Sequence, residues 1–191
     1  MIKKRGKHLL IIGGGVFQVP AIKVAKSMGL KVVVTDYNRE AEGMLMADYP
    51  IEVSTRNINL TVNAAKQFHA SCPLDGVMTV GTDASQTVSA VANALNLPGI
   101  PFEVAERATD KINMRRWLSK MGVAVPRFRP VWTMDDLKEA MEEMLFPLVI
   151  KPCDNMGARG VKMIRESHEA SSAFQEAKEA SISGKLIIEE F

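Results

Sequence analysis

The sequence is poor in cysteine and has neither a long apolar run nor an excess of charge of one sign. Its two cysteines, Cys72 and Cys153, are far apart and have no partner at zinc-ligand spacing. They predict neither a disulfide framework nor a thiolate metal site, and a reducing cytoplasm fits best. No run of about 18 apolar residues is present, and the basic start precedes an apolar run too short for a signal peptide. We therefore expect a cytoplasmic protein that is neither secreted nor inserted into a membrane.

The charge balance and the length narrow the class of protein further. Lys and Arg total 24 against 22 Asp and Glu, so the formal net charge is only +2. This balance gives no reason to expect nucleic acid as a partner. The 191 residues, 47% of them hydrophobic, allow one large globular domain or two small ones. We find no repeat of fixed period and no low-complexity segment.

The N-terminal part of the sequence predicts a parallel sheet covered by helices. Strand-like apolar runs occupy residues 8–12, 31–35, 51–53 and 76–80, and helical patterns occupy 19–29, 57–70 and 84–95. Such alternation is typical of βαβ units. Residues 97–101 are rich in turn formers and predict a connector. We expect a Rossmann-like domain over residues 1–105.

The C-terminal part, residues 106–191, predicts a mixed α+β structure. Helical patterns lie at 110–121, 134–145 and 166–181, and strands are expected within 125–130, 147–151, 161–164 and 185–190. The first helix collects Met114, Trp117, Leu118 and Met121 on one apolar face and places Lys111 and Arg115 on another. A short glycine-containing loop joins 147–151 to 161–164, so these two strands should form an antiparallel hairpin.

Three glycines, Gly13 to Gly15, follow the first predicted strand, and Asp36 ends the second. This placement is what a dinucleotide-binding turn requires. The motif fails at its third glycine, because Gln18 stands where a glycine would let the helix pack closely on the strand. We favour a tight turn that needs glycine only for its backbone conformation. An NAD(P)-dependent oxidoreductase is the alternative hypothesis.

A second turn, 81–86, follows the strand at 76–80, at the edge of the sheet where open α/β sheets bind ligands. Two interpretations stay open for it. In one, Asp83 contacts a small substrate together with Gly14 of the first turn. In the other, Thr82 or Asp83 caps the next helix and Gln86 reaches back to complete a capping box.

A third group joins Lys111, Lys151 at the end of a strand, and the glycine loop 155–160. Glycines let backbone N–H groups approach phosphate oxygens, and an ammonium group beside them neutralises phosphate charge. Residues 105–129 add a local excess of five positive charges, with seven basic residues against two acidic ones. The group therefore predicts a phosphate clamp. The alternative is a set of solvated lysines beside an ordinary hairpin turn. The loop does not have the Walker spacing.

Taken in order, the segments from Asp110 to Phe191 resemble the front part of the ATP-grasp fold. The matching segments are Asp110-Lys111, 122–126, 147–152, 157–161 and 187–191. The fold is shared by biotin carboxylase, the carbamoyl phosphate synthetase large chain and carboxylate-amine ligases of purine synthesis. Residues 8–101 similarly resemble the domain that precedes the grasp. The resemblance implies an α/β protein in which a Rossmann-like pre-ATP-grasp domain, 1–105, is followed by the first α+β lobe of an ATP-grasp domain, 106–191.

The resemblance also implies a site and a chemistry. Lys111 and Lys151 would contact the phosphates of ATP, and Glu189 would bind adenine N6. The covering loop would comprise Asn155, Met156, Gly157, Ala158, Arg159 and Gly160, and the backbone of Glu190 and Phe191 would complete the adenine hinge. Such ligases use MgATP to convert a small carboxylate into an acylphosphate that a nucleophile attacks. Family ligands for Mg²⁺ lie beyond the hinge, so no metal ligand is assigned in this chain. We therefore expect a truncated ligase, one half of a ligase encoded by a split gene, or a remnant of a ligase, and we predict that the chain does not turn over alone.

A non-catalytic hypothesis is a nucleotide-binding module that pairs with a separately encoded C-terminal half or forms a homo-oligomer. A strand at 185–190 without a partner would then be a docking edge. Cys153, beside the proposed loop, is a candidate for alkylation with loss of ATP binding.

Overall fold

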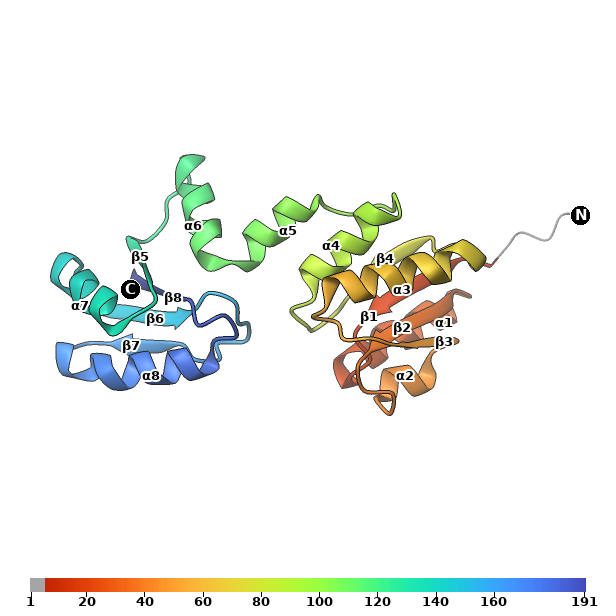
Figure 1. Ribbon diagram of the computed structural model, residues 1–191, viewed down its shortest axis with the longest axis horizontal. Helices are drawn as coiled ribbons and strands as arrows, with labels where there is room; N and C mark the ends of the chain where they lie inside the picture. The colour runs from red at the N-terminus through yellow and green to blue at the C-terminus, as the bar shows by residue number, and fades with distance from the viewer. Residues whose placement is uncertain (1–5) are drawn as a thin grey trace, which may run out of the picture. The chain divides into compact units, whose positions relative to one another are not determined.

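The computed structural model describes residues 6–191, so the basic start of the chain and the beginning of the predicted first domain, residues 1–5, lie outside the described part. The chain divides into two compact units that meet between Ala105 and Glu106. Each unit has its own sheet, labelled in Figure 1. Helix α5 (Phe102–Thr109) begins in the first unit and ends in the second.

The first unit contains a parallel sheet with the strand order β3-β2-β1-β4. Its strands are β1 (His8–Ile12), β2 (Lys31–Asp36), β3 (Tyr49–Glu52) and β4 (Gly76–Met78). The two central strands, β1 and β2, are the most apolar, and Leu10 lies opposite Val33 between them. This is expected because strands covered on both faces read as continuous apolar runs.

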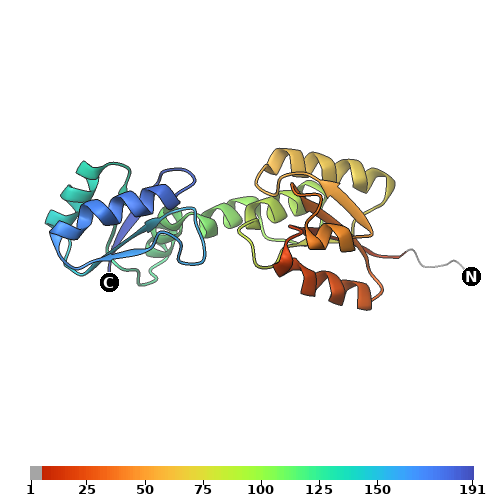
Figure 2. The ribbon, with the colours of Figure 1, turned by 90° about the horizontal axis from the view of Figure 1, so that it is seen from below.

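Helices cover both faces of this sheet. They are α1 (Val19–Ser27), preceded by a 3₁₀ turn (Val16–Gln18), α2 (Glu42–Met46), α3 (Ile58–Ser71) and α4 (Ser85–Ala94). Ile11 packs on the side of α1 and α2, whereas its neighbour Leu10 packs on the side of α3 and α4. Alternate residues of one strand thus supply two cores. Figure 2 shows α1 and α3 on opposite sides of the sheet.

The second unit contains an antiparallel sheet with the strand order β5-β8-β6-β7. Its strands are β5 (Phe128–Val131), β6 (Leu148–Pro152), β7 (Lys162–Ile164) and β8 (Leu186–Glu190). Its helices are α6 (Lys111–Lys120), α7 (Met134–Glu143) and α8 (Ala170–Ala180), the last preceded by a 3₁₀ turn (Ser167–Glu169). The predicted hairpin is present as β6 and β7.

Strand β8 is a central strand of this sheet, and its successive side chains point to opposite faces. Ile188 belongs to the main core, which α7 and α8 supply. Ile187, one residue earlier, packs on the other face with Ile112 of α6 and with Cys153. The prediction of a free edge at 185–190 is therefore wrong, because β8 pairs with β5 on one side and β6 on the other.

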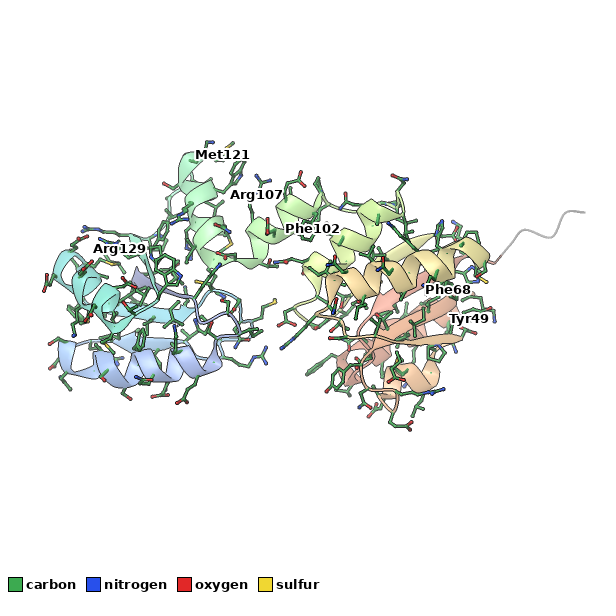
Figure 3. All side chains as sticks on the ribbon, in the orientation of Figure 1. Tyr49, Phe68, Phe102, Arg107, Met121 and Arg129 are labelled. Atoms are coloured by element: carbon green, nitrogen blue, oxygen red, sulfur yellow. The ribbon has the colours of Figure 1, made fainter. Side chains whose placement is uncertain are left out.

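The apolar face predicted for α6 is not the face that meets the sheet. Ile112 is buried, whereas Trp117 and Met121 are 40% and 63% exposed. The Trp117 ring instead lies beneath the guanidinium of Arg107, 4.0 Å from the ring centroid, as cation–π pairs do. Figure 3 labels Arg107 and Met121, the latter at the end of α6 far from the sheet of this unit. Within residues 6–191, no helix combines the length and apolarity that crossing a membrane requires.

Candidate functional site

The side chains predicted to bind phosphate gather on the α6 face of the second sheet. Lys151 lies opposite Ile187 in the β6–β8 pairing, so Lys151 and Glu189 are diagonal neighbours on one face. Helix α6 brings Lys111 and Arg115 toward this face together because they are four residues apart. The structure thus pairs Lys151 with Glu189 and places Lys111 near enough to interact electrostatically with both.

The carboxylate of Glu189 is the centre of the cluster. Arg115 donates from Nε to Oε1 at 2.7 Å and from Nη2 to Oε2 at 3.4 Å, and Lys151 forms an ion pair with Oε2. The Glu189 side chain is 5% exposed. Burial by itself would raise the pKa of Glu189, but the hydrogen bonds and charges of Arg115 and Lys151 outweigh burial and hold this pKa below its ordinary value. Glu189 is therefore a buried carboxylate that stays ionised at neutral pH.

Lys111 ties helix α6 to the start of the glycine loop. Its Nζ donates to the carbonyl oxygens of Asn155 at 2.7 Å and of Cys153 at 3.4 Å. The helix begins at this point because the Asp110 side chain caps it, accepting the backbone N–H of Asn113 at 2.9 Å. Burial lowers the pKa of Lys111. The ammonium group is therefore partly desolvated, which strengthens its attraction for an anion.

The glycine loop is anchored at its base and exposed at its tip. Asp154 accepts hydrogen bonds from the Ser181 hydroxyl and from the backbone N–H groups of Ile182 and Ser183. Asn155 donates from Nδ2 to the carbonyl of Ala180 at 2.9 Å. Beyond these anchors, Met156, Gly157, Ala158 and Arg159 are exposed, and Gly157, Ala158 and Gly160 all have positive φ. Gly160 also has no room for a side chain, since a Cβ there would lie 2.5 Å from the Ala180 Cβ.

Glu190 is the last residue of strand β8, and Phe191 follows it. The backbone N–H of Glu190 donates to the carbonyl of Arg127 at 3.0 Å, and that of Phe191 donates to the carbonyl of Pro147 at 3.1 Å. The Glu190 carboxylate accepts the N–H of Leu145 at 3.0 Å. Adenine binding by the backbone of these two residues stays a prediction.

A second candidate site is a pocket of about 560 Å³ in the first unit, formed by the turns that follow the four parallel strands. Its lining includes Gly13, Asp36, Arg56, Thr82 and Asp83. Asp83 lies 3.8 Å from the guanidinium of Arg56. The capping interpretation of this turn is wrong, because α4 has Ala84 as its N-cap residue and no side chain caps it. Asp83 is thus left facing the pocket.

The glycine turn is closed by protein groups that a dinucleotide would have to displace. Asp36 Oδ2 accepts the N–H of Gly14 at 2.8 Å, and the Gly14 carbonyl accepts the N–H of Gly43 at 2.7 Å. A bound pyrophosphate would need backbone N–H groups such as that of Gly14, and a ribose would need the carboxylate of Asp36, but these two groups are bound to each other. Gln18 donates to the carbonyl of Val80, and its side chain packs against Gly13. The geometry favours a packing role for these glycines.

Sequence reasoning placed Arg115 on the same helix face as Lys111, but it did not identify Glu189, which is 74 positions away, as the partner of Arg115. It also missed Asp154, which holds the loop. No local pattern could have shown that partner, because the turn at 181–183 comes after a whole helix. Across the described residues, no group of three or more His, Cys, Asp or Glu side chains could hold a metal ion.

Two family models match the chain: an ATP-grasp N-terminal domain over residues 22–99 and an ATP-grasp domain over residues 116–191. The chain belongs to the ATP-grasp family. The mixed α/β architecture expected from the sequence, a parallel sheet followed by an antiparallel one, is confirmed.

Individual relatives agree with this assignment. A formate-dependent phosphoribosylglycinamide formyltransferase from Prochlorococcus marinus is 24% identical over 97% of this chain and 47% of its own length. A crystal structure of an L-amino acid ligase from Bacillus licheniformis is 26% identical, with a TM-score of 0.75 over 99% of this chain and 45% of its own.

An N5-carboxyaminoimidazole synthetase from Staphylococcus aureus, solved with ADP, shares the fold at 20% identity, with a TM-score of 0.76 over 98% of this chain and 48% of its own. The chain spans about half the length of the curated relatives it matches.

Proposed function

We propose that this chain forms the nucleotide-binding part of an ATP-dependent ligase, with ATP held on the α6 face of the second sheet. The observation that carries the proposal is buried Glu189 paired with Arg115 and Lys151, with Lys111 close enough to interact electrostatically with Glu189 and bound to an anchored glycine loop. Phosphate oxygens need positive charge and N–H donors in a site poor in water. Lys111 and Lys151, beside an anchored loop, supply this positive charge, whereas the donors of Arg115 are bound to Glu189.

In this proposal, Lys111 and Lys151 contact the phosphates, and residues 155–160 cover them. Glu189 accepts the exocyclic amine of adenine, and the backbone of Glu190 and Phe191 forms the hinge. The low pKa of Glu189 supports this role, since an ionised carboxylate is a strong acceptor. Both lysines act electrostatically rather than as bases.

The reaction that we propose for the complete ligase is transfer of the γ-phosphoryl group of ATP to an oxygen of a small carboxylate. ADP leaves, and an amine or another nucleophile then attacks the acyl carbon and displaces phosphate. Mg²⁺, when bound, would neutralise phosphate charge, and we expect its ligands outside this chain because no acidic cluster of the described residues fits it. The name of the L-amino acid ligase supports carboxylate activation by analogy only.

The pocket of the first unit is proposed to hold the small substrate. Its position at the carboxyl edge of a parallel sheet supports this role, because ligands of open α/β sheets bind there. Asp83 is the residue that we expect to contact the substrate. Gly14 would act by shaping the turn, since it is buried and its N–H is bound to Asp36.

The remaining parts of the proposal concern partners and location. The ligase would work in the cytoplasm with its C-terminal half, either in one longer polypeptide or as a separate chain, and a homo-oligomer is compatible with both. Reading the gene beyond the codon for Phe191 tests this point. An in-frame continuation with acidic metal ligands indicates one polypeptide, whereas a stop codon indicates a separate partner or a binding module.

Calorimetric titration of the chain with ATP, GTP and NADH tests the nucleotide site. We expect ATP to bind, NADH to give no signal, and Lys151→Met to weaken ATP binding roughly tenfold or more, as loss of a charge-assisted contact does. Lys138→Met is the matched control, because this lysine forms an exposed ion pair on α7. Absence of ATP binding, or tight binding of NADH, would overturn the proposal.

A further inference from the structure

Arg115 is the least expected member of the charged cluster. Its guanidinium binds both oxygens of Glu189, and its side chain is 22% exposed. It lies in the middle of α6, whose start is fixed by Asp110 and by Lys111. The guanidinium of Arg115 is therefore held by a well-anchored helix and already binds the carboxylate of Glu189.

The single ammonium group of Lys151 has two possible partners, the Glu189 carboxylate and a nucleotide phosphate. In the structure it is paired with Glu189, whereas the proposed function requires it to contact a phosphate. Transferring Lys151 to a phosphate removes one cation from a carboxylate that is 5% exposed. A buried carboxylate without a cation is strongly disfavoured. The exchange is favourable only if another positive group stays on Glu189.

We propose that Arg115 is a positioning residue that keeps Glu189 paired and oriented, so that Lys151 is free to bind a nucleotide phosphate. The inference rests on the proposed function. It assigns no phosphate contact to Arg115, because Glu189 already occupies its Nε and Nη2 donors. A guanidinium suits this task better than an ammonium group, since its planar fork fixes both the position and the rotation of a carboxylate.

A second consequence concerns the base of the nucleotide. A carboxylate that is fixed and ionised accepts a hydrogen bond from an amino group, as on adenine, and repels a carbonyl oxygen, as on guanine. If Lys151 moves to a phosphate, the contact with Arg115 is what keeps Glu189 in place for this discrimination. Arg115 therefore supports both phosphate binding and preference for ATP over GTP, without touching either ligand.

A double-mutant cycle between Arg115→Gln and Glu189→Gln tests the inference, with ATP and adenosine as ligands. Arg115→Gln should weaken ATP binding about tenfold or more but adenosine binding by less than about threefold, since only ATP competes for Lys151. In the Glu189→Gln background the same change should weaken ATP binding by less than about threefold, because no carboxylate then holds Lys151. Arg116→Gln, at an exposed neighbouring arginine, should have no effect.

The results that contradict a positioning role for Arg115 differ from one another. An equal loss of ATP affinity in both backgrounds would show that Arg115 contacts phosphate directly and would overturn the inference. Equal losses for ATP and adenosine would indicate general damage to the site and would also overturn it. Failure of the unmutated chain to bind ATP would instead refute the proposed function. If Arg115→Gln does not fold by circular dichroism, Arg115→Lys, which keeps the charge but not the fork, should give an intermediate loss, and affinity equal to the unmutated chain would overturn the inference.

Discussion

The thiol of Cys153 should resist alkylation as long as the protein is folded. Its side chain is fully buried with Ile112 and Ile187 between α6 and the sheet. Burial, with the charge of Asp110 adding to it, raises the pKa of the thiol from an ordinary value of 9.0 to about 12. The structure therefore argues against the sequence-based idea that Cys153 is a convenient site for blocking nucleotide binding.

The size of the effect follows from the thiolate fraction, because the thiolate is the form that reacts. Well below its pKa, a thiol loses tenfold in thiolate for each unit by which the pKa rises, so the change at Cys153 lowers its thiolate fraction about a thousandfold at pH 8. The greater nucleophilicity of a more basic thiolate offsets part of this loss. Steric exclusion acts in the same direction. Alkylation in the native state should therefore require local or global opening of this part of the second unit.

Iodoacetamide labelling at pH 8, followed by mass spectrometry of the two cysteine peptides, measures this directly. Cys72 is only partly buried and serves as the internal reference. We expect Cys72 to be labelled long before Cys153 in the folded chain, and both at similar rates in concentrated denaturant. Labelling of Cys153 at the rate of Cys72 without denaturant would refute the account of this small core.

Three further predictions concern stability in urea. Gly43→Ala should destabilise the first unit by about 1–3 kcal/mol, because the new Cβ would lie 2.7 Å from the carbonyl oxygen of Gly14. Thr133→Ala should cost about 1 kcal/mol by removing the capping box of α7. At Asp154, burial alone would raise the pKa, but hydrogen bonds from the Ser183 region outweigh it and lower the pKa below 3.8. The stability that this ionised carboxylate contributes is thus present above pH 3.8 and is lost as the pH falls below that value. Asp154→Asn should therefore lower the free energy of unfolding at neutral pH, and lower it less in acid.

Each of these changes has a matched control. Gly6→Ala adds a Cβ with nothing within 4 Å and should leave stability unchanged. Thr133→Ser keeps the capping hydroxyl and should stay close to the unmutated chain. Asp135→Asn alters a carboxylate that is 84% exposed and should change the free energy of unfolding at neutral pH by less than about 0.5 kcal/mol. Destabilisation by a control equal to that of its partner would contradict the corresponding mechanism.

The sequence was most informative where a local pattern determines the outcome. The continuous apolar run at 8–12 and the glycines after it identified β1 and its turn, because strands buried on both faces have no alternation to misread. Lys111 could be placed at the start of a helix because Asp110 before it is a strong capping residue. The short helices α2 and α5 were not predicted. Helix α2 has only five residues, too few for a helical period to be visible.

The sequence was least informative where residues far apart decide the outcome. Periodicity identified an apolar face on α6 but not which face of the helix meets the sheet. The face that carries Arg115 meets the sheet, because Arg115 forms an ion pair with Glu189, which also binds Lys151. Strand order is equally non-local, since β8 separates β5 from β6 although it comes last in the chain. The ion pair between Arg115 and Glu189 joins residues 74 positions apart, so no spacing rule could have indicated it.

The late position of β8 in the chain has a consequence for synthesis on the ribosome. The paired strands β6 and β7 can form a hairpin as soon as they emerge, but β5 meets the sheet only through residues 186–190. Until those residues are free of the exit tunnel, Val131 and Ile150 have no strand between them to close the core. The second unit should therefore acquire resistance to proteolysis abruptly rather than gradually as the nascent chain lengthens. The first unit, whose sheet is complete by Met78, should reach that state earlier in translation.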